Sequence, residues 1–106
     1  MDKHSQRRLD VAVLKQALLD LRLRTDGFRM KAEQQEECID QMLEAARWLF
    51  ANRHPNHVLS LQGICERLGV DTCKLARRVF EGLSLARQQE IRGGLRHYRG
   101  ALFEAT

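Results

Sequence analysis

Proline, aromatic residues and long apolar runs are all scarce in this chain, and each scarcity narrows the structures that it can form. There is one Pro in 106 residues, and Phe, Trp and Tyr together make up 6%. Abundant Leu, Ala, Arg, Gln and Glu favour helices over sheets where Pro is rare. No apolar run approaches the roughly 20 residues that a membrane-spanning helix needs. The sequence therefore predicts an all-α fold with an aliphatic core and no membrane span.

Cysteine is also scarce, and its three positions do not form a disulfide framework. Cys38, Cys65 and Cys73 are an odd number of thiols, which is typical of a reducing, cytosolic setting. The first ten residues are polar and charged, unlike a secretory signal. We therefore expect a cytoplasmic protein.

The length predicts a single domain, residues 1–106, with three functional parts. Residues 9–53 are expected to form a two-helix support and dimerisation region. Residues 60–83 are expected to form two short helices, and residues 84–106 a basic C-terminal segment. A short chain buries a smaller fraction of its surface than a long one, so a small all-α domain often completes its core by dimerising.

The first helix is predicted over residues 10–24, with a broad apolar face and with Asp10, Lys15 and Arg22 outside it. The apolar face is made by Leu9, Val13, Leu14, Ala17, Leu18 and Leu21. Further apolar residues lie on other sides of this helix, at Val11, Leu19 and Leu23. A helix that is apolar on several sides is expected to have more than one neighbour, and a second copy of the chain is one candidate.

A second helix is predicted over residues 28–52, where apolar residues recur at three- and four-residue steps. Its solvent face is acidic and carries Glu33, Glu36, Glu37, Asp40 and Glu44. Trp48 lies off the centre of the apolar stripe, where it is expected to cover the edge of the core or to join an interface. Pro55 disfavours helix at the residue before it, which predicts a loop over 53–57.

The sequence pattern of residues 61–80 predicts two short helices joined by a tight turn. Gly69 lies where the turn needs a positive φ, which Gly adopts without steric cost. Ser60 is expected to cap the first helix, and Asp71 or Thr72 the second. Apolar residues at helical spacing are expected to share one core, namely Ile64, Leu68, Val70, Leu75 and Val79.

The C-terminal segment leaves three interpretations open. Gly93 and Gly94 separate two short stretches over residues 89–99, which is compatible with a β-hairpin, a broken helix or a flexible basic tail. Positive charge is concentrated nearby, because residues 71–99 carry seven basic and three acidic side chains. The whole chain has a net charge of +4, which suits a polyanionic partner.

The segment 61–80 resembles the helix-turn-helix of DNA-binding proteins, in which the second helix enters the major groove. The matching features are small Cys65 at the helix crossing, Gly69 in the turn, and the apolar residues around them. Arg78 departs from the pattern, since that position is usually apolar, and Val79 can take its place after a slight rotation.

The resemblance implies two sets of contact residues on a double-stranded DNA partner. The candidates for base contact are Thr72, Cys73, Lys74, Ala76 and Arg77. The candidates for phosphate contact are Gln62, Arg78, Arg87, Arg92, Arg96 and Arg99. A homodimer would present two reading helices one DNA turn apart.

We therefore expect a small sequence-specific DNA-binding protein that acts as a transcriptional regulator. The alternative is a helical protein-interaction module or subunit, for example a small phage- or plasmid-type regulator that binds another protein. No catalytic constellation or cofactor-binding motif is present in the sequence, so an enzyme is not expected. His54, His57 and the cysteines lack the close spacing of a zinc site, so no metal is expected.

Overall fold

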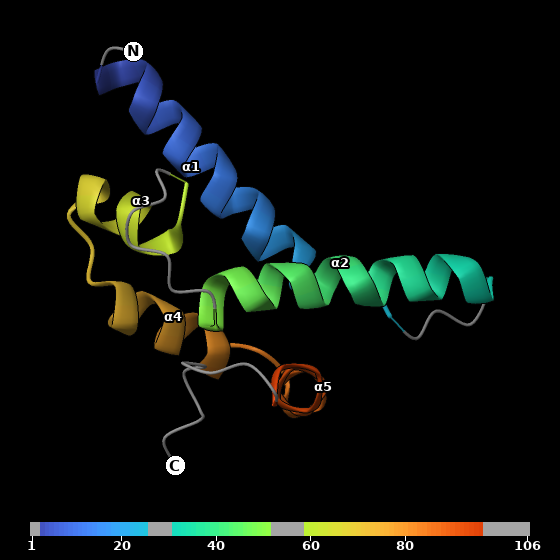
Figure 1. Ribbon diagram of the computed structural model, residues 1–106. Helices are drawn as coiled ribbons and strands as arrows, with labels where there is room; N and C mark the ends of the chain where they lie inside the picture. Colours follow the sequence, from blue (N-terminus) through green and yellow to red (C-terminus); the bar gives the residue numbers. More distant parts are fainter. Residues whose placement is uncertain (1–2, 26–30, 52–58, 97–106) are drawn as a thin grey trace.

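The computed structural model describes residues 3–25, 31–51 and 59–96, and within these residues it contains five α-helices and no strand (Figure 1). The helices are α1 (Lys3–Asp20), α2 (Ala32–Phe50), α3 (Leu61–Leu68), α4 (Thr72–Glu81) and α5 (Leu85–Leu95). The expected all-α class is thus confirmed. None of the helices in these ranges is long and apolar enough to cross a bilayer.

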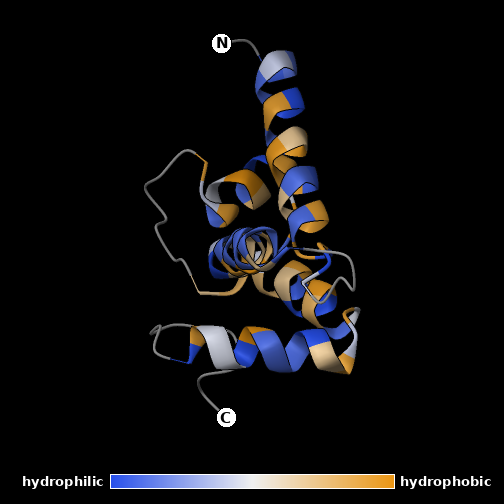
Figure 2. Cartoon of the chain, turned by 90° about the vertical axis from the view of Figure 1, so that its right-hand side faces the viewer, coloured by the Kyte–Doolittle hydropathy of each residue, from blue (hydrophilic) through white to orange (hydrophobic). Residues whose placement is uncertain are grey.

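The C-terminal half of α2 is the centre of the core. α1 and α5 both pack against α2, while α3 packs against α1 and α4. The largest fully buried side chains are Phe50, Leu21, Met42, Ile64, Ile91 and Leu95. Figure 2 shows α5 crossing the end of this assembly, and its buried residues are Ile91 and Leu95. All five helices therefore contribute to one core around α2.

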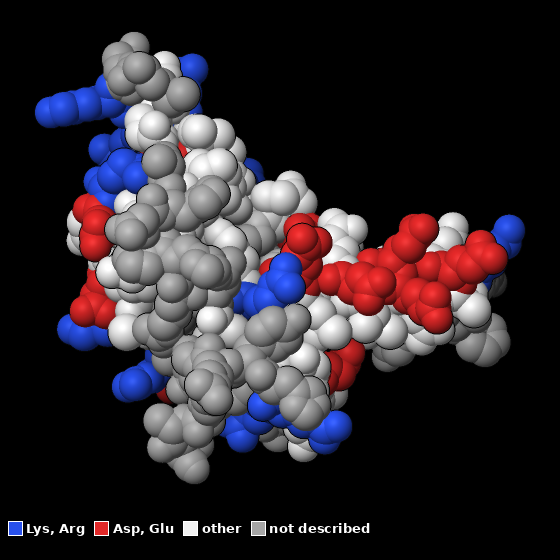
Figure 3. All heavy atoms as spheres, viewed as in Figure 1, with Lys and Arg blue, Asp and Glu red and all other residues white. Residues whose placement is uncertain are grey.

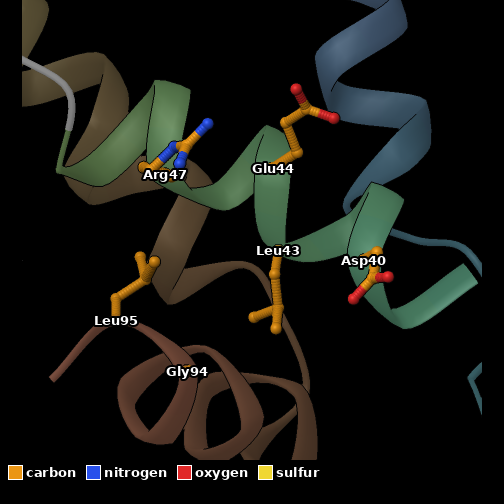
Figure 4. Close-up of a pocket in the computed structure, with 6 residues that line it drawn as sticks. All are labelled: Asp40, Leu43, Glu44, Arg47, Gly94 and Leu95. Atoms are coloured by element: carbon orange, nitrogen blue, oxygen red, sulfur yellow. The ribbon is translucent and has the colours of Figure 1, made fainter. Parts of the chain in front are cut away.

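The hairpin interpretation is wrong at its central glycines, because Gly93 and Gly94 lie inside α5. α5 packs so closely on α2 that a Cβ atom at Gly94 would lie 2.5 Å from Cδ2 of Leu43. Figure 4 shows the Leu43 side chain pointing from α2 towards Gly94. The absence of a side chain at Gly94 lets the two helices approach, so this glycine permits packing and does not make a turn.

Asp10 is also placed differently from the expectation that it lies outside the buried face of its helix. Its side chain is 1% exposed and lies between α1 and the end of α3. Arg67 donates two hydrogen bonds to it, from Nε to Oδ2 and from Nη2 to Oδ1, each 2.8 Å long. Gln6 donates a third, 2.9 Å long. Asp10 is buried because Arg67 supplies an opposite charge, a contact that fixes α1 to α3.

Candidate nucleic-acid interface

The α3–α4 unit, residues 60–81, begins with a well-formed cap. The backbone N–H of Gly63 donates to Oγ of Ser60 over 3.1 Å, as expected for Ser at the N-cap. Gly69 caps the C-terminal end of α3, and its φ of 73° lies in the left-handed region. The N–H of Val70 then donates to the carbonyl of Cys65 over 2.9 Å and closes the turn. Local chemistry thus sets both ends of α3.

α4 begins at a second cap, and Asp71 rather than Thr72 provides it. The carboxylate of Asp71 accepts a hydrogen bond of 2.9 Å from the N–H of Lys74. A negative charge at this end is also favourable to the helix dipole. Thr72 is half-buried in the first turn of α4.

The inward face of α4 includes one residue that the sequence analysis assigned to DNA bases. Ala76 is 4% exposed and belongs to the core, so its side chain is not available for a base contact. The reason lies one turn further on, where Phe80 packs its ring against Phe50 at 5.4 Å with an edge-to-face angle of 82°. This contact orients α4 and turns Ala76 inward with it. Val70, expected in the core, is 43% exposed.

The outward face of α4 brings together most of the remaining candidates. Cys73, Lys74, Arg77 and Arg78 are all exposed, at positions that share one side of the helix. Three of the four are basic, and Glu81 in the last turn is the acidic residue on the same side. Figure 3 shows both basic and acidic side chains on the α3 and α4 side of the molecule, whereas most of the charged side chains along α2 are acidic. α4 therefore presents a basic, solvent-accessible surface.

Two of the α5 arginines lie on the surface, and one of them contacts α4. Arg92 is exposed, and its guanidinium carbon lies 5.4 Å above the centre of the Phe80 ring, a cation–π distance. Arg96 follows the last turn of α5 and is exposed. Gln62 is half-buried in the first turn of α3. Arg99 lies outside the described residues.

Arg87 was predicted to contact phosphate, but its side chain is engaged inside the fold. It is 14% exposed and donates from Nη2 to the carbonyl of Leu23 over 2.6 Å. Its Nε lies 4.0 Å from a carboxylate oxygen of Glu90, and the other oxygen of Glu90 accepts a hydrogen bond from Thr25. Arg87 therefore holds α5 to the segment after α1, and we correct its assignment to a structural one.

The cysteines of the α3–α4 unit differ sharply in environment. Cys65 is fully buried at the helix crossing, as expected, and Cys73 is exposed on α4. Burial raises the pKa of the Cys65 thiol above its ordinary value, although a hydrogen bond with Thr72 acts in the opposite direction. In the described residues no three His, Cys, Asp or Glu side chains are grouped as metal ligands. His54 and His57 lie outside those residues.

The Asp10–Arg67 pair near the α3–α4 unit is not expected from the sequence. The hydrogen bonds from Arg67 hold the pKa of the Asp10 carboxyl below its ordinary value, against the effect of burial. Arg67 lies in the last turn of α3, two residues before Gly69. The pair therefore ties α1 to the part of the chain from which α4 is presented. Its only signal in the sequence was an acidic residue next to an apolar face.

Comparisons of the chain with protein-family models, with curated proteins and with solved structures found no match.

Proposed function

We propose that this protein binds double-stranded DNA in a sequence-specific manner, through the outward face of α4, and acts as a homodimeric transcriptional regulator. The observation that carries the proposal is the exposure of Lys74, Arg77 and Arg78 on one side of a capped helix that follows a tight turn. A helix of this size fits the major groove of B-DNA, where its early turns reach base edges.

The chemistry of the exposed residues divides them into two roles. Arg77 is the candidate for specific readout, because a guanidinium can donate two hydrogen bonds to O6 and N7 of guanine. Lys74 and Cys73, one turn earlier, lie on the same side of α4 and can contact neighbouring bases. Arg78, Arg92 and Arg96 are suited to phosphates, with Gln62 as a further polar contact. Neutralising phosphates in this way makes affinity depend steeply on salt.

The experiment is selection from a random duplex pool, followed by a salt titration of binding to the enriched sequence. Arg77→Ala is expected to weaken binding to that sequence by about 5- to 150-fold and to relax preference at one base position. Arg24→Ala is the matched control, because it removes the same charge from an exposed position in the segment after α1. The proposal is contradicted if no sequence is enriched from the pool, or if the two variants lose equal affinity for the enriched sequence.

The groove between α1 and α2 favours a second candidate, a protein-interaction module. It has a volume of about 330 Å³, and Val13, Ala17, Ala45 and Trp48 supply its apolar wall. The indole N–H of Trp48 donates to the carbonyl of Leu59 over 3.0 Å, which holds the ring at the edge of the groove. If a protein partner binds here, Trp48→Ala will abolish that complex and Arg77→Ala will leave it intact.

A further inference from the structure

The outer face of α1 is exposed and carries both basic and apolar side chains. We define this outer face by residues on one side of α1 and its C-terminal turn, namely Arg8, Ala12, Lys15, Leu19 and Arg22, all of them exposed. The three basic residues recur every seven positions, and Leu19 is 55% exposed. A leucine this exposed on a regular helical face loses contact with water when another surface packs on it.

The outer face of α2 has the opposite charge and a similar spacing. Its acidic stripe, defined as Glu33, Glu37, Asp40 and Glu44, follows three- and four-residue steps and is exposed throughout. Figure 3 shows that acidic side chains gather along α2. Like charges three and four residues apart destabilise an isolated helix, so the stripe gains stability from a cationic neighbour.

We infer that a second copy of this chain binds here, with the outer face of α1 of each copy packed against the acidic stripe of the other. A two-fold axis relates the two copies, so the contact between the outer face of α1 and the acidic stripe occurs twice. Basic residues meet acidic residues at both contacts. Charged residues recur at seven-residue intervals on both faces. Helices that pack side by side contact one another at this interval, so the two patterns are compatible. The inference supplies the surface for the homodimer in the proposed function, and it rests on that part of the proposal.

The size of the two faces sets the strength of such a dimer. A helix of 18 residues is about 27 Å long and about 10 Å wide, so the two faces cover about 500 Å² on each copy. The total of about 1,000 Å² is at the lower limit for a specific interface, and the charged residues make it sensitive to salt. α4 packs at the other end of α2, where Phe80 meets Phe50, so the dimer leaves its outward face uncovered. The inference therefore predicts a weak dimer that forms best at low salt.

The test is sedimentation equilibrium of the full chain without DNA, at 50 and at 500 mM salt. Lys15→Glu and Asp40→Lys each place like charges at both contacts, and each is expected to raise the dimer dissociation constant at least tenfold. An equimolar mixture of the two variants pairs opposite charges at both contacts, and we expect it to recover dimers. Lys74→Glu, an equal charge change on α4, is the matched control that leaves the dimer unaffected.

Several outcomes overturn the inference. They are a wild-type chain that stays monomeric at every concentration, a dimer that neither single variant weakens, or a mixture that does not recover it. Because no DNA is present, these outcomes are distinct from failure of the DNA-binding proposal, which the duplex selection measures. Circular dichroism checks that each variant remains folded, as expected for substitutions at exposed positions.

Discussion

The two adjacent glycines of α5 offer a controlled test of how this helix packs on α2. Gly93 and Gly94 both lie in the helix, but only Gly94 faces Leu43. A Cβ atom at Gly93 meets nothing within 4 Å. At Gly94 it lies 2.5 Å from one methyl carbon of Leu43 and 3.1 Å from the other. The same substitution at two neighbouring positions therefore separates helix propensity from packing.

The expected effects have opposite signs. Gly93→Ala stabilises the fold by about 0.5 to 1 kcal/mol, because Ala loses less backbone entropy in a helix than Gly. Gly94→Ala gains the same amount but adds an overlap with Leu43, and overpacking of this kind costs about 1 to 3 kcal/mol. Leu43 is half-buried and can shift partly, which places the net loss near 1 kcal/mol.

Urea and thermal unfolding followed by circular dichroism measure the difference. A gap of about 1 to 3 kcal/mol between the variants corresponds to a Tm difference of about 4 to 24 °C for a domain of this size. Leu43→Ala in the Gly94→Ala background removes the overlapping methyl groups, so the double variant is expected to be more stable than the sum of the single effects. If Gly94→Ala stabilises as much as Gly93→Ala, α5 does not approach α2 in the manner described.

Two further predictions concern buried groups. The folded-state pKa of Asp10 is lowered by its pairing with Arg67. The pairing therefore contributes fully to the free energy of unfolding at pH values above the ordinary carboxyl pKa of about 4. This contribution is lost as the pH falls through the folded-state pKa. The urea midpoint of the wild type is expected to fall more between pH 7 and pH 3 than that of Asp10→Asn, and equal falls would contradict the assignment. Iodoacetamide is expected to modify Cys73 in the folded protein and Cys65 only after unfolding, because burial shields the second thiol and raises its pKa. Mass spectrometry of peptides locates the label, and early labelling of Cys65 would refute this.

Features set by local chemistry could be predicted from the sequence. The turn at Gly69 follows from its free φ, and the cap at Ser60 follows from the short reach of its hydroxyl to the third N–H of the helix. Cys65 was expected inside and Cys73 outside, and both are found there. Each of these predictions depends on residues within a few positions of one another.

Features that depend on distant contacts could not be predicted. Asp10 is buried because Arg67, 57 residues away in the sequence, reaches it. Ala76 turns inward because α4 is oriented by Phe80, and the four-residue step between them was the available signal. Gly94 is typical of a turn in the sequence, but in the structure its lack of a side chain leaves room for Leu43 of α2. In each case a contact with another helix decides the outcome, and for Ala76 that contact is the one between Phe80 and Phe50 of α2.

The contact between Asp10 and Arg67 also limits how this sequence can diverge. Loss of the Arg67 charge leaves the buried Asp10 carboxylate without an opposite charge, whereas replacing both residues with apolar ones can be neutral or stabilising. The two positions are therefore expected to change together, although more than half the length of the chain separates them. Homologues with this fold should carry both charges or neither, and intermediates with a single charge should be rare.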